Sequence, residues 1–190
     1  MESGGPVAAP HGGDPRLRFP SLRGHSPRVP ASSFVAATAI ILGDVTLGDD
    51  TSVWYGAVLR GDVGPIRVGA RTNIQDLCVL HTTTGRSGLT VGDEVTVGHR
   101  VILHGAAVRD RCLIGMGSIL LDDCEIGEES LVAAGAVVLE GHKIPPRSFV
   151  AGVPATVRGA IPPDALARLR ESADAYVALA REHAALARGR

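Results

Sequence analysis

The chain has 190 residues and a formal net charge of −1, with 19 Lys+Arg against 20 Asp+Glu. This length suits one domain with a hydrophobic core, and the charge balance gives no reason to expect a nucleic-acid or membrane partner. With no long apolar run and no secretory signal pattern, we expect a cytoplasmic protein, the alternative being an organelle transit peptide at the arginine-containing N-terminus.

The N-terminal segment 1–30 is rich in glycine and proline. Such a segment has little apolar surface to bury. We therefore expect residues 1–30 to be irregular or disordered and not to pack on the rest of the protein.

From Val35 onward an aliphatic residue recurs at every sixth position, with short breaks before Val68, Val91 and Val108. Period six fits neither an α-helix nor a simple strand. It fits a coil of three short parallel strands in which every sixth side chain points into a prism-shaped core, and coils stack about 4.8 Å apart. Residues 31–160 are thus predicted to form an all-β domain, a parallel β-helix of hexapeptide repeats. The predicted core positions are Val35, Ile41, Leu47, Val53, Leu59, Val68, Ile74, Leu80, Val91, Val97, Leu103, Val108, Ile114, Leu120, Ile126, Val132, Val138, Ile144 and Val150.

The three cysteines each lie four residues after a repeat aliphatic, at a position that alanine or serine fills in other hexads. They are odd in number and lack CxxC spacing, so disulfides are not expected. We interpret Cys78, Cys112 and Cys124 as small residues of the core.

The pattern changes after Pro162. Apolar residues then recur at helical spacing, from Leu166 through Leu169 and Ala173 to Ala180, and a proline near the first turn suits a helix start. The C-terminal segment 161–190 is predicted to hold one amphipathic helix, over about 163–188, packed on the β-helix.

Two histidines are predicted to lie one above the other. The chain between His81 and His104 contains a short insertion between the repeats, and once this is left out the interval is one whole coil of three hexads. The same reasoning places Arg60 one coil before His81. Both histidines follow a leucine, so they should point outward from the same face.

A third histidine, His99, occupies a different hexad position and belongs to another face. Asp76 lies one coil before it, and Gln75 and Asn73 lie beside Asp76. One prism cannot bring all three histidines together, but two prisms can if their faces meet around a threefold axis. The remaining histidines, His11, His25, His142 and His183, are expected to be solvated.

Three imidazoles with an open fourth position are typical of a catalytic zinc site. Imidazole also suits Fe²⁺ and Co²⁺. Asp76 is placed to accept the second N–H of a ligand histidine, or to pair with Arg60 across the interface. The opposing interpretation is that the histidines cap strand edges or pack between subunits; their convergence favours the metal.

Over about residues 31–180 the sequence resembles the gamma-class carbonic anhydrases. The motifs that carry the resemblance are Arg60-Gly-Asp62, Asn73-Ile-Gln75-Asp76, Leu80-His81, Gly98-His99 through His104-Gly105, and Ile114-Gly-Met-Gly117. The resemblance implies a left-handed β-helix with a C-terminal helix, assembled as a homotrimer. It also implies that His81 and His104 bind a metal in one subunit together with His99 of the next.

The same resemblance implies roles for the neighbouring polar residues. Gln75 and Asn73 would flank the metal-bound solvent, and Arg60, Asp62 and Asp76 would form the polar interface beside it. Tyr176 matches a tyrosine that reaches the site and is the nearest hydroxyl for proton transfer. The short loop 82–88 holds no acidic residue, which places the chain with the subclass that lacks the acidic loop, whose members are not all active.

The expected function is metal-dependent, reversible hydration of carbon dioxide to bicarbonate. Two alternatives stay open. A hexapeptide-repeat acyltransferase would use a general-base histidine beside a coenzyme A groove and no metal. A noncatalytic trimeric scaffold would keep the metal without the reaction.

Overall fold

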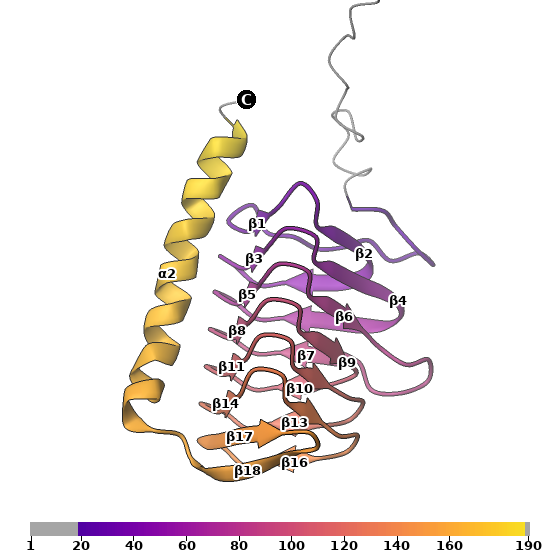
Figure 1. Ribbon diagram of the computed structural model, residues 1–190. Coiled ribbons are helices and arrows are strands. Elements are labelled where there is room, and N and C mark those ends of the chain that lie inside the picture. Colours follow the sequence, from indigo (N-terminus) through magenta and orange to yellow (C-terminus); the bar gives the residue numbers. More distant parts are fainter. Residues whose placement is uncertain (1–18, 189–190) are drawn as a thin grey trace, which may run out of the picture.

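A computed structural model describes residues 19–188. Residues 1–18 of the predicted N-terminal segment, with His11, and residues 189–190 of the predicted C-terminal segment lie outside this range. The chain winds into a parallel β-helix with a single helix, α2 (Pro163–Arg188), running along the stack of coils (Figure 1). The predicted parallel β-helix of hexapeptide repeats with one C-terminal helix is confirmed.

The β-helix has three faces. The helix-covered face comprises β1 (Phe34–Val35), β3 (Ser52–Val53), β5 (Asn73–Ile74), β8 (Thr96–Val97), β11 (Leu113–Ile114), β14 (Leu131–Val132) and β17 (Ser148–Gly152), closed by the antiparallel β18 (Ala155–Ala160). The histidine face carries β6 (Val79–His81), β9 (Ile102–His104), β12 (Ile119–Leu120) and β15 (Val137–Val138). The third face carries β7 (Leu89–Val91), β10 (Ala107–Val108), β13 (Glu125–Ile126) and β16 (Lys143–Ile144).

Two long strands join the last two faces at one end of the stack. β2 (Ile40–Leu47) and β4 (Val58–Val68) pair with each other along their length. The first half of β4 then pairs with β6, and its second half pairs with β7.

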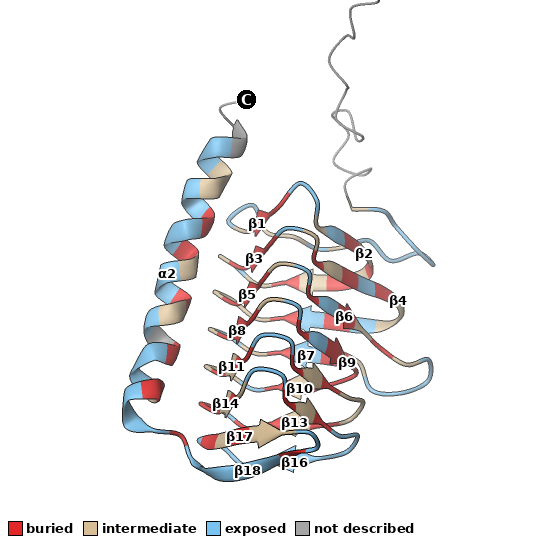
Figure 2. Ribbon diagram, in the orientation of Figure 1, coloured by how far each residue is buried: buried red, intermediate tan, exposed pale blue. Residues whose placement is uncertain are grey.

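The core follows the period of six. All the aliphatic positions predicted from the repeat belong to one buried cluster, and the buried residues recur along each strand of the stack (Figure 2). Cys78, Cys112 and Cys124 are free and buried in the same cluster, as expected for small core residues. Burial raises the pKa of each of these thiols to about 12.

Helix α2 lies against β1, β3, β5 and β8. It begins at Pro163 with Asp164 in its first turn, where a proline and an acidic residue both suit a helix start. Its buried side chains are Ala165, Leu169, Ala173, Val177 and Ala180. Within residues 19–188, no helix combines the length and the apolar character needed to cross a membrane.

The segment before the first strand contradicts one expectation. Residues 19–30 do pack on the β-helix, because Phe19 and Val29 lie against its core and Arg28 forms a parallel bridge with Thr46. The end coil of a stack would otherwise expose its core, so a covering segment is favourable even when its composition is poor in apolar residues.

Candidate metal site

His81 and His104 end β6 and β9 and pair directly in register. This is the stacking predicted from the coil of three hexads. Their ring centroids are 5.2 Å apart, and His81 Nδ1 lies 3.2 Å from His104 Nε2. Two imidazole nitrogens therefore face each other at the edge of the histidine face.

Each ring also meets a carboxylate through its other nitrogen. His81 Nε2 lies 2.9 Å from Asp62 Oδ1, and His104 Nδ1 lies 3.1 Å from Asp122 Oδ2. When both rings donate to these carboxylates, the facing nitrogens carry lone pairs. Two lone pairs at this distance repel each other unless a proton or a cation lies between them, so this donor set fits a metal ion.

Asp122 was missed by the sequence analysis. It follows His104 by one full coil of three hexads, and that spacing is the signal that could have found it. Thr83, in the loop after His81, donates from Oγ1 to the same carboxylate oxygen at 3.1 Å.

Asp62 also pairs with Arg60. Partial burial of the Asp62 carboxyl acts to raise its pKa, but hydrogen bonds from His81 and Arg60 outweigh this and hold the pKa below its usual value. Asp62 thus remains a carboxylate at neutral pH, able to accept from His81.

His99 lies on the turn between β8 of the helix-covered face and β9 of the histidine face. Its Nδ1 is 2.8 Å from Asp76 Oδ2. The other oxygen of Asp76 accepts from the backbone N–H of Tyr55 at 3.1 Å. Among the described residues of one chain, no three His, Cys, Asp or Glu side chains form a metal-binding group.

Gln75 and Asn73 form a buried chain of amides beneath α2. Gln75 Nε2 donates to Asn73 Oδ1 at 3.0 Å, and Asn73 Nδ2 donates to Thr96 Oγ1 at 3.0 Å. The Thr96 hydroxyl then meets Ser172 of α2 at 2.8 Å. Asn73 is fully buried and Gln75 is 5% exposed. Asn73 therefore cannot contact a ligand itself, but its Oδ1 holds the amide of Gln75 in place.

Tyr176 lies on α2 beside this region. Its ring packs edge-on against Trp54 with centroids 5.6 Å apart. Burial, with a smaller contribution from the Asp76 charge, raises the pKa of the Tyr176 phenol. The phenol therefore keeps its proton at neutral pH, on the side of the chain where His99 and Asp76 lie.

One histidine expected to be solvated is partly buried instead. His183 of α2 packs against Trp54 with ring centroids 5.0 Å apart, and its Nδ1 lies 3.0 Å from the Tyr55 hydroxyl. The contact between α2 and Trp54 covers part of the His183 ring, which the spacing of histidines along the chain could not reveal. His25 and His142 are exposed, as expected.

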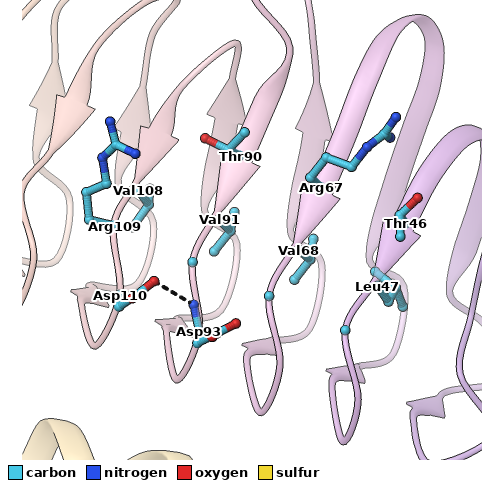
Figure 3. A pocket seen from close by; sticks show the side chains of 13 residues that line it. Thr46, Leu47, Arg67, Val68, Thr90, Val91, Asp93, Val108, Arg109 and Asp110 are labelled. Carbon is cyan, nitrogen blue, oxygen red and sulfur yellow. Dashed lines mark hydrogen bonds between the residues drawn. The ribbon is translucent and has the colours of Figure 1, made fainter.

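A groove of about 380 Å³ runs along the edge of the third face (Figure 3). Its charged groups are already occupied: Arg67 pairs with Asp44 at 2.7 Å, and Asp110 accepts from the backbone N–H of Asp93 at 2.9 Å. No histidine lines the groove.

Comparison with known proteins identifies the family. A family model described as bacterial transferase hexapeptide (six repeats) matches residues 105–140. An Arabidopsis thaliana protein named gamma carbonic anhydrase 2, mitochondrial, is 41% identical over 84% of this chain, which spans 59% of that relative's length. A Geobacillus kaustophilus protein named carbonic anhydrase is 55% identical over 135 residues, 71% of this chain and 74% of that protein. The chain belongs to the gamma-class carbonic anhydrase family.

A solved structure with the same fold is named as a transferase and not as a carbonic anhydrase. A hexapeptide transferase family protein from Anaplasma phagocytophilum is 40% identical, with a TM-score of 0.81 over 85% of this chain and 95% of that one. Proteins of one fold can run different reactions, so the choice of activity depends on the site.

Proposed function

We propose that this protein is an enzyme that reversibly hydrates carbon dioxide to bicarbonate at a metal site shared between subunits of a homotrimer. His81 and His104 of one subunit and His99 of the next would hold the ion, with Zn²⁺ favoured and Fe²⁺ or Co²⁺ as alternatives. The facing nitrogens of His81 and His104, each ring backed by a carboxylate, carry this proposal, and the names of the relatives support the reaction.

Two features support a site shared between subunits: the position of His99 and an exposed apolar column on the histidine face. His99 has its own carboxylate, and within the described residues it is not part of any group of three His, Cys, Asp or Glu side chains that could hold a metal. The histidine face also presents an outward column of β-branched apolar side chains in register, of which Ile40 is 49%, Val79 39% and Ile102 37% exposed. The column comprises Ile40, Val58, Val79, Ile102, Ile119 and Val137. An apolar stripe beside two histidines suits burial by a second copy of the chain.

The protein residues then have distinct tasks. A bound zinc ion supplies a nucleophile at neutral pH by lowering the pKa of water to about 7. Gln75, held by Asn73, orients the attacking oxygen, and Arg60 stabilises the negative charge of bicarbonate. Tyr176, protonated at neutral pH, can pass a proton only as a hydrogen-bonded waypoint between the site and buffer.

Two other activities compete with this one. An acyltransferase is supported by the name of the Anaplasma relative, but the groove on the third face lacks the histidine that would act as general base. A noncatalytic scaffold would keep the metal and the trimer without the reaction. Three free cysteines favour a reducing compartment and so a cytoplasmic protein.

The deciding experiment is stopped-flow hydration of carbon dioxide with the metal content of the same sample counted. We expect hydration that scales with bound metal, is lost in His99→Ala, and persists in His142→Ala, which changes an exposed histidine outside the site. Full metal content without hydration would establish the scaffold. A metal-free protein that transfers acetyl groups from acetyl coenzyme A would establish the acyltransferase.

A further inference from the structure

Asp122 is a carboxylate on the turn after β12 to which no role has been assigned so far. We propose that it is a positioning residue for His104, holding that imidazole with Nε2 turned towards His81. The inference rests on the proposed metal site, because a fixed Nε2 matters only if that nitrogen is a ligand.

The contacts of Asp122 converge on one oxygen. Oδ2 lies 3.1 Å from His104 Nδ1 and accepts from Thr83 Oγ1 at 3.1 Å. The Thr83 hydroxyl therefore fixes the carboxylate, and the carboxylate selects the tautomer of His104 with its proton on Nδ1. Nε2 is then free to bind a cation.

Gly105 makes this approach feasible. A Cβ built on Gly105 would lie 2.1 Å from Asp122 Oδ1, and Gly105 has a positive φ of 59°. Any side chain at this position would collide with the carboxylate. The glycine directly after His104 thus leaves room for the group that orients His104.

The second oxygen argues against a purely structural role. Asp122 Oδ1 is buried without a hydrogen-bond partner among the described residues, and an unpaired buried acceptor costs free energy. The neighbouring Asp123, whose side chain is 41% exposed, lies 3.5 Å from the guanidinium of Arg86, an ordinary surface pair. A turn selected for stability alone would not need a carboxylate at position 122 whose Oδ1 is buried without a partner.

His81, the other histidine on the same face, is paired with a carboxylate in the same way as His104. Asp62 accepts from His81 Nε2 as Asp122 accepts from His104 Nδ1. The two carboxylates lie on the outer sides of the two rings, so the unprotonated nitrogens meet between them. Removing either carboxylate frees its ring to protonate the nitrogen that should bind the metal.

The test compares Asp122→Ala and the conservative Asp122→Asn with Asp123→Asn as the matched control. Zinc affinity is measured by competition with a chelator, and the tautomer of His104 by ¹⁵N NMR of histidine-labelled, metal-free protein. Loss of such an orienting carboxylate weakens metal binding by about 10- to 100-fold. We expect that loss in Asp122→Ala with a rise of the Nε2–H tautomer, partial rescue in Asp122→Asn, and wild-type behaviour in Asp123→Asn.

Two failures are distinguishable. Unchanged zinc affinity and an unchanged tautomer in Asp122→Ala would overturn the inference while leaving the proposed function intact, even if the melting temperature fell. A wild-type protein that bound no zinc would overturn the proposed function, and the tautomer in metal-free protein would still show whether Asp122 orients His104.

Discussion

His81 and His104 lie far apart along the chain, yet their facing nitrogens are only 3.2 Å apart because one coil of the β-helix stacks directly on the next. His99 lies on the turn that joins β8 of the helix-covered face to β9 of the histidine face. A single chain therefore presents His81 and His104 together and His99 at a separate position, so a site with all three needs two chains.

Subunits that lack different ligands should complement each other. Neither His81→Ala nor His99→Ala alone should bind metal at a shared site. Refolded together, each mixed trimer regains one interface with His81 and His104 on one side and His99 on the other. Random mixing should restore about a quarter of the wild-type zinc content, measured by elemental analysis of the purified trimer. No restoration would place all the ligands in one chain.

Chelation should weaken both folding and assembly. A ligand present at 1,000 times its dissociation constant stabilises the native state by about 4 kcal/mol, and a metal held by two chains ties that free energy to the trimer. We expect metal-free protein to melt at a lower temperature and to dissociate at higher concentration than the holo protein, as followed by calorimetry and sedimentation. Identical melting and sedimentation of the two forms would rule out ligands from two chains.

Tyr176→Phe should affect proton transfer more than metal binding. Because the phenol is protonated at neutral pH, we expect turnover to be modest and to rise with imidazole concentration. The variant should be slower than wild type in dilute buffer and equal to it in concentrated buffer, at unchanged zinc content. If the variant were less stable but showed no buffer-dependent loss of turnover, the role of Tyr176 would be limited to packing against Trp54.

The buried thiols make stability fall at alkaline pH. Their pKa in the folded protein is raised from 9.0 to about 12, so the unfolded chain loses these protons first. Their contribution is fully present below pH 9 and is lost as the pH rises from about 9 towards 12. Urea denaturation at pH 7.5 and at pH 10 should show a smaller loss of stability in the Cys78→Ala, Cys112→Ala, Cys124→Ala triple variant. An equal loss in the variant would contradict this account.

One corner of the β-helix carries a ladder of alternating charges. Six residues in successive coils adopt φ values between 53° and 58°: Asp50, Arg71, Glu94, Arg111, Glu129 and Arg147. Glu129 is buried, with Oε1 lying 3.3 Å from Arg111 and Oε2 2.7 Å from Arg147. Such a ladder favours one stacking register over a shift by one coil, which would place like charges together.

We expect Glu129→Gln to lower the free energy of unfolding by about 2 kcal/mol, because it removes the charge that accepts hydrogen bonds from Arg111 and Arg147. Glu125→Gln removes the partner of Arg109 on the more exposed third face and should cost less than about 1 kcal/mol. Urea denaturation of the two variants compares them directly. If the two variants lost the same free energy of unfolding, burial of Glu129 would not strengthen its ion pairs.

The sequence alone determined the architecture and the stacking of His81 on His104. A period of six sets which side chains point inward, and a coil of three hexads sets which residues lie above one another, so both follow from counting. The helix over 163–188 likewise follows from its spacing of apolar residues. These features are repeated along the chain and do not depend on any single contact.

Only the tertiary structure decided what each polar group meets. Counting could not show that Asp122 approaches His104 through the space left by Gly105, that Asn73 is sealed beneath α2, or that His183 packs on Trp54. It also could not show that Phe19 covers the core of the first coil. Periodicity fixes the height of a residue on the stack, whereas these contacts depend on the rotamer of each side chain and on the path of α2 and of the N-terminal segment across the faces.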